Sequence, residues 1–183
     1  MENTNRITIN GIIHTILQEQ GMFLLFLPGA HYLLRVKADE ALLKQAKAYQ
    51  GKRMNITGKL ASEDAALINQ CKCNTISNTI ESFVIADDIT ATHFNNHVKI
   101  KGMIVDTPKL ITTDKNSFYT CRIHLSDNNG YISVSTPDNP GKKGDVITVE
   151  GHLRWKDYNR ILTCKKCGKS YTAPTLSLLV ICR

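Results

Sequence analysis

Apolar and polar residues alternate along several short stretches of the chain, and this period of two predicts β-strands. In the N-terminal half, Gly11 interrupts the first stretch, which is typical of a strand that bends sharply. Residues 38–49 differ, because they carry apolar or small residues at helical spacing and end before Gly51, so they predict a short helix. The strands predicted in this half are Arg6–Leu17, Met22–Leu27, His31–Val36, Arg53–Leu60 and Ser82–Ile89.

The C-terminal half repeats this order of strands. The predicted strands are Val98–Val105, Phe118–Leu125, Tyr131–Ser135, Val146–Leu153 and Leu176–Ile181. The helix is missing here, because residues 136–144 are rich in proline and glycine and predict a loop. Five strands with a helix between the third and the fourth are typical of the OB-fold, a small Greek-key barrel.

The two halves also match residue by residue. Ile7–Ile13 resembles Val98–Ile104, and downstream a second block matches at a slightly larger offset. In that block Gly51, Gly58, Leu60, Ile68 and Cys71 correspond to Gly144, Gly151, Leu153, Ile161 and Cys164. We therefore predict an all-β protein with one short helix, made of two tandem OB-fold barrels that arose by internal duplication. The barrels are expected at residues 1–92 and 97–183, joined by a short polar linker near residues 90–97.

The composition agrees with compact barrels, since 42% of the 183 residues are hydrophobic. No run approaches the roughly 18 apolar residues of a membrane span, and the N-terminus does not read as a signal peptide. We therefore expect an intracellular, cytoplasmic protein.

Charge is distributed unevenly between the halves. Lys and Arg exceed Asp and Glu by 23 to 16, and residues 1–95 hold nine of each kind, so the net charge of +7 belongs to residues 96–183. Such an excess is expected of a surface that meets phosphates, although a merely solvated surface would also explain it.

Two stretches of the second unit resemble bacterial single-stranded DNA-binding proteins. Residues 149–155, Val-Glu-Gly-His-Leu-Arg-Trp, resemble the fourth strand of that family, and residues 98–108, with Gly102 and Pro108, resemble its first strand. The resemblance implies binding of single-stranded DNA in replication, recombination or repair. The chain departs from the family in having two barrels and several cysteines.

One cluster combines aromatic and cationic residues, the types that hold single strands by stacking and by phosphate contacts. We expect it at the turn between the fourth and fifth strands of the second unit, with the chain reversing at residues 157–159. Trp155 and Tyr158 are the leading stacking candidates. The cluster comprises His152, Arg154, Trp155, Lys156, Tyr158 and Arg160.

Further candidates lie on the first three strands of the second unit. They are Lys99, Lys101, Phe118, Arg122 and Tyr131. Strand alternation places Tyr119 with the core and Phe118 on the outer face with Arg122. In the first unit the corresponding turn, residues 61–66, is acidic and has no aromatic residue, so we expect the second barrel to bind and the first to stabilise, dimerise or recruit.

Cysteine pairs occupy equivalent places in the two units. Cys71 and Cys73 form one pair, and Cys164 and Cys167 form the other, which is followed by Gly168 as in a zinc knuckle. Because tetrahedral zinc takes four ligands, one zinc joining the two barrels is the leading hypothesis. Local disulfides, free thiols and a site shared between two chains remain open alternatives. Cys121 and Cys182 lie in apolar strands and are expected to be buried thiols.

No catalytic motif is evident in the sequence: there is no P-loop, no GxSxG and no HExxH. The leading reading is therefore a non-enzymatic protein that binds single-stranded DNA. A protein-binding adaptor in a replication or secretion assembly and an RNA-binding protein are the alternatives. Replication or recombination proteins are expected partners, and barrels of this kind allow a homo-oligomer.

Overall fold

The computed structural model describes residues 4–66, 78–91, 97–127, 130–164 and 166–183. Across these ranges no helix is long and apolar enough to cross a bilayer. The N-terminal half contains β1 (Arg6–Leu17), η1 (Gln18–Gln20), β2 (Met22–Phe26), β3 (Leu33–Lys37), α1 (Glu40–Ala48), β4 (Arg53–Ala66) and β5 (Asn78–Thr90). The C-terminal half contains β6 (His97–Ile104), β7 (Lys109–Thr112), β8 (Ser117–Leu125), β9 (Tyr131–Thr136), β10 (Val146–Thr163) and β11 (Ser170–Ile181).

The strands β1 to β5 close into a barrel in the order β1-β2-β3-β5-β4, and β4 pairs back onto β1. Strands β3 and β5 run parallel, whereas the other neighbours are antiparallel. The helix α1 lies between β3 and β4. It begins after Asp39, whose side chain accepts a hydrogen bond from the Leu42 amide at 2.8 Å. This is the strand order and helix position of an OB-fold.

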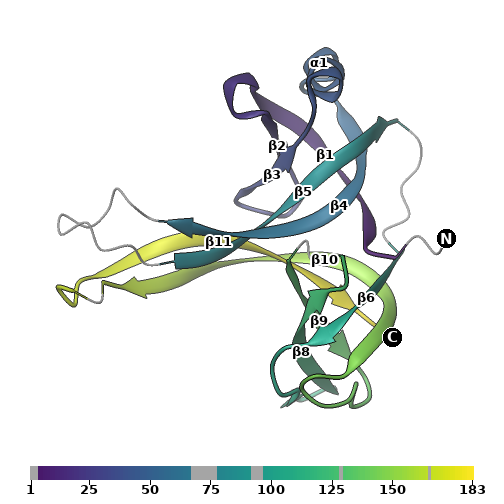
Figure 1. The fold of residues 1–183 in the computed structure, drawn as a ribbon, viewed down its shortest axis with the longest axis vertical. Helices are drawn as coiled ribbons and strands as arrows, with labels where there is room; N and C mark the ends of the chain where they lie inside the picture. Colours follow the sequence, from purple (N-terminus) through teal and green to yellow (C-terminus); the bar gives the residue numbers. More distant parts are fainter. Residues whose placement is uncertain (1–3, 67–77, 92–96, 128–129, 165) are drawn as a thin grey trace.

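The strands β6, β8, β9, β11 and β10 form a second ring with the same order. Strand β8 pairs with β6 and β9, β11 runs parallel to β9, and β10 pairs with both β11 and β6. Strand β7, which the sequence did not predict, pairs with β8 beyond the end of β6. Residues 137–145 form a loop where the first barrel has its helix. The two predicted tandem OB-fold barrels are therefore confirmed (Figure 1).

The barrels share their register as well as their strand order. Ile7 faces Gly58 across β1 and β4, and Val98 faces Gly151 across β6 and β10. These four residues are the ones that the sequence repeat aligns. The duplication therefore reaches the level of individual cross-strand pairs, because a slip of one residue would turn every side chain to the other face of the sheet.

The barrels are joined at Asn5, which is 2% exposed. Its backbone N–H donates to the Lys99 carbonyl at 3.0 Å, and its side chain accepts from the Lys101 amide at 2.9 Å and donates to Ser126 Oγ at 3.0 Å. Ile9 of the first barrel belongs to a hydrophobic core cluster that also contains apolar side chains of the second barrel. The two barrels therefore pack as one body.

In each barrel the fourth and fifth strands continue into a long hairpin, and both hairpins point to the same side of the molecule (Figure 1). Strand β10 runs unbroken to Thr163, paired with β11, so the strand end predicted at Leu153 and the turn predicted at residues 157–159 are wrong. Strand β4 likewise runs through residues 61–66, which were predicted as a turn. The reason is tertiary, because backbone pairing with a long partner strand keeps turn-forming residues extended.

Candidate nucleic-acid interface

In the second barrel, β8, β9, β11 and β10 form a four-stranded sheet. The side of this sheet that faces away from the barrel interior is here called the outer face. One row of cross-strand partners crosses it from edge to edge. Arg122 on β8 faces Ser133 on β9, which faces Leu179 on β11, which faces Arg154 on β10. A cation therefore stands at each end of the row, and small or apolar side chains lie between them. This is the order of groups that a phosphate-flanked base would meet.

A groove with a volume of about 580 Å³ follows this face. Phe118 of β8 and Lys156 of β10 line it, with Leu179 and Ile181 of β11 between them and Arg183 also lining it. Ser135 of β9 contributes a small side chain. The groove therefore combines an aromatic ring, two cations and an apolar floor.

Four of the predicted binding residues belong to the row or to its groove on the outer face. Phe118 and Lys156 line the groove. Arg154 is exposed and ends the row of cross-strand partners beside the groove. Arg122 is exposed as well, and its Nε lies 3.0 Å from Asp106 Oδ2. That ion pair holds the guanidinium in place at the edge of β8 and offsets part of its charge.

Of the remaining predicted residues on the first three strands, Lys99 and Lys101 lie outside this sheet, whereas Tyr131 alternates with Ser133 on β9 and so shares the outer face. Lys99 and Lys101 belong to β6, where Lys99 Nζ lies 3.5 Å from Glu150 Oε1 and Lys101 is exposed. The Tyr131 ring lies 4.8 Å from the His124 ring, and its backbone exchanges hydrogen bonds with Ser62 Oγ of the first barrel at 3.3 Å. Tyr131 therefore takes part in the contact between the barrels.

Trp155 does not reach the outer face. Because β10 has no turn at this point, Trp155 points to the opposite side from Arg154 and Lys156, where it is half-buried against the core cluster. The predicted aromatic and cationic cluster is thus divided between two faces. Tyr158 and Arg160 belong to β10 by their backbone, and their side chains lie outside the described part of the structure.

The equivalent row of the first barrel has a different character. It runs through Leu24, Arg35, Phe83 and Ala61, which the shared register places on Arg122, Ser133, Leu179 and Arg154. Phe83 and Ala61 are each only 5% exposed, although they lie on the outside of their barrel. Strand β5, which carries Phe83, contacts β11 of the second barrel. This face is therefore covered at Phe83 and Ala61, whereas Arg122 and Arg154 at the ends of its counterpart are exposed.

The cysteines are placed as follows. Cys164 is buried and Cys167 exposed at the end of the β10–β11 hairpin, whereas Cys71 and Cys73 lie outside the described residues. In the described part, no three His, Cys, Asp or Glu side chains gather as a metal site. Cys121 is buried, as predicted, whereas Cys182, which was also predicted to be buried, is only partly buried. Burial raises the pKa of both thiols, and the charge of Asp106 raises the pKa of Cys121 further.

The sequence matches no protein-family model and no curated protein. Among solved structures, the chain is similar to the single-stranded DNA binding protein of Thermus aquaticus, with a TM-score of 0.58 over 97% of this chain and 89% of that one. The two sequences are 14% identical. The resemblance that the strand motifs indicated is therefore confirmed for the fold.

Proposed function

We propose that this protein binds single-stranded DNA along the outer face of its second barrel. The observation that carries the proposal is the open row from Arg122 to Arg154, with the groove of Phe118 and Lys156 beside it. The net positive charge of residues 96–183 supports it. The fold that the chain shares with the single-stranded DNA binding protein of Thermus aquaticus gives further support.

The groups on this face suit a single strand better than a duplex. Base faces are accessible in a single strand and stack on an aromatic ring such as Phe118, while cations such as Lys156 follow the phosphates. The serines of β9 leave room above the middle of the sheet for bases. Because Arg154 and Lys156 are exposed, the geometry favours nucleic-acid binding over the adaptor alternative.

We further propose that the protein acts without catalysis, in the cytoplasm, during DNA replication, recombination or repair. Its covered first barrel would stabilise the second, and other replication or recombination proteins or a second copy of the chain would be its partners. These assignments follow the resemblance to bacterial single-stranded DNA-binding proteins.

We also propose one structural zinc, held by Cys71, Cys73, Cys164 and Cys167. Support comes from the C-terminal pair, where Gly168 has φ of 72° and donates its N–H to the Cys164 carbonyl at 2.9 Å. A left-handed glycine after the second cysteine gives the tight turn of a zinc knuckle. Cys71 and Cys73 enter the proposal from the sequence repeat alone.

Competition tests the binding proposal. A labelled oligothymidine bound to the protein is displaced with unlabelled oligothymidine, oligouridine or duplex DNA of the same length. We expect unlabelled oligothymidine to displace the labelled oligothymidine and the duplex to displace it only weakly. Equal displacement by oligouridine would show that RNA is also a ligand, since only contacts to the 2′-hydroxyl separate the two backbones. Stronger displacement by the duplex would contradict the proposal.

A further inference from the structure

Strand β10 leaves its barrel before it ends. Its pairing with β6 stops at His152, and β11 pairs with β9 only through Leu179–Ile181. From Trp155 to Thr163, β10 therefore has β11 as its one partner strand among the described residues. A two-stranded ribbon is marginally stable in water unless it packs against something else. Lys156, which lines the groove, stands near the start of this ribbon.

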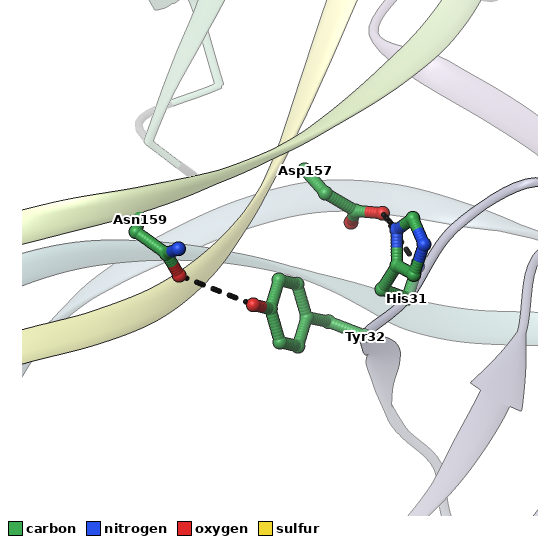
Figure 2. Close-up of polar contacts among 4 residues, drawn as sticks. All are labelled: His31, Tyr32, Asp157 and Asn159. Carbon is green, nitrogen blue, oxygen red and sulfur yellow. Dashed lines mark hydrogen bonds and ion pairs between the residues drawn. The ribbon is translucent and has the colours of Figure 1, made fainter.

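The β2–β3 turn of the first barrel supplies part of that support, in addition to the contact between β5 and β11 (Figure 2). The His31 backbone N–H donates to Asp157 Oδ2, and His31 Nδ1 lies 3.0 Å from the same oxygen. A carboxylate only accepts, so Nδ1 carries the proton in this contact. The Tyr32 hydroxyl donates to Asn159 Oδ1 at 3.2 Å.

These contacts are specific for the register of β10. Asp157 and Asn159 alternate along one face of the strand, and two consecutive turn residues reach both of them (Figure 2). A shift of β10 by one residue would turn Lys156 toward the turn in place of Asp157. The Asp157 side chain is only 14% exposed, whereas the His31 side chain is 85% exposed, so the carboxylate is the shielded partner of this contact.

We propose that the β2–β3 turn clamps β10 and so fixes Lys156 in the groove of the other barrel. His31 and Tyr32 are then positioning residues for nucleic-acid binding, supplied by the barrel whose own outer face is covered. This inference rests on the proposed function. It also assigns a role to Asp157, an acidic residue that follows Lys156 in the sequence and points to the opposite face of β10.

The direction in which one substitution changes the affinity for nucleic acid distinguishes the clamp from simple electrostatics. Removing the charge of Asp157 would by itself raise affinity for a polyanion. The clamp predicts the opposite for Asp157→Ala, because the ribbon loses its hold on the first barrel. Asp157→Asn keeps an acceptor for the His31 amide and therefore rescues binding. Asp88→Ala, which removes an exposed carboxylate of β5, is the charge-matched control.

The test measures the Kd for labelled oligothymidine across a salt series and amide hydrogen exchange in residues 155–163. The clamp predicts about tenfold weaker binding for Asp157→Ala, an unchanged salt slope, faster exchange in β10, and a smaller loss for Tyr32→Phe. Binding by Asp157→Ala as tight as or tighter than that of the unmodified chain would overturn the clamp alone. Failure of the unmodified chain to bind would overturn the proposed function.

Discussion

Gly58 and Gly151 occupy the same place in the two barrels, each directly beneath a carbonyl of the strand that follows. A Cβ on Gly58 would stand 2.0 Å from the Ile85 oxygen, and a Cβ on Gly151 would stand 2.3 Å from the Ile181 oxygen. Both distances are far shorter than any real contact, so the close approach of two backbones requires glycine at both positions. The shared glycine of the sequence repeat thus has a structural cause in each barrel.

Substituting either glycine should destabilise the fold. We expect Gly58→Ala and Gly151→Ala each to lower the free energy of unfolding by about 3 kcal/mol, which corresponds to a fall in Tm of about 6 to 12 °C. Thermal denaturation followed by circular dichroism measures this. Thr148→Ala, at an exposed position of β10, is the control and should cost less than about 1 kcal/mol. Equal Tm values for the glycine variants and the control would show that the strands can separate without cost.

Single cations of the outer face should each contribute a salt-dependent part of the affinity. For Arg154→Ala and Lys156→Ala we expect weaker binding of oligothymidine and a salt slope reduced by about 0.7 for each cation removed. Fluorescence anisotropy at several salt concentrations measures both quantities. Lys44→Ala removes an exposed cation of α1, whose Nζ lies 3.3 Å from Glu40, and should leave the slope unchanged. A slope that falls equally in all three variants would mean that the protein binds through its general charge.

Two aromatic residues on opposite faces should behave differently. Phe118→Ala should weaken binding about tenfold, because one stacked base is worth about 1–3 kcal/mol. Trp155→Phe keeps the packing of the inner face and should leave the Kd unchanged. Near-ultraviolet circular dichroism checks that both variants are folded. If Trp155→Phe lost more affinity than Phe118→Ala, the stacking surface would have to lie on the inner face of β10.

Purified protein prepared under reducing conditions should contain about one zinc per chain. Chelation should lower its Tm, and Cys164→Ser should lower both the zinc content and the Tm, since structural zinc contributes to folding. Elemental analysis gives the stoichiometry, and Cys121→Ser controls for the loss of a thiol outside the proposed site. A zinc-free protein whose Tm does not respond to chelator would rule the zinc out.

The thiols should differ in reactivity after removal of metal. Because the thiolate is the reactive form and burial raises the pKa of Cys121 and Cys182, both should remain protonated and react slowly at pH 8. Their raised pKa values also mean that folding stability falls as the pH rises above about 9, where the unfolded chain ionises first. Alkylation located by peptide mass spectrometry should modify the exposed Cys167 before Cys121. The reverse order would contradict the burial of Cys121.

The strand order could be predicted from the sequence because it depends on local signals. Alternation around Gly11 and Gly102, the helical spacing before Gly51 and the loop at residues 136–144 each act within a few residues. Because the two halves repeat, the strands predicted in one barrel also support those predicted in the other.

The lengths of the hairpins and the division of the binding cluster could not be predicted this way. Asp157 and Asn159 are turn-forming residues in isolation, but in the folded chain they face His31 and Tyr32 of the other barrel. That contact joins residues more than a hundred positions apart in the sequence, so no local sequence pattern predicts it. The inward position of Trp155 follows from the same unbroken strand. Phe118, in contrast, was placed on the outer face by alternation alone.

The role of the outer face can be measured by titrating a fluorescein-labelled oligothymidine with the unmodified chain and with the double variant Arg154→Glu, Lys156→Glu. We expect saturable binding by the unmodified chain that weakens steeply as salt is raised, and loss of binding by the double variant while its Tm is preserved. Binding by both proteins with the same Kd, or by neither at low salt, would contradict the claim that the outer face of the second barrel holds single-stranded DNA.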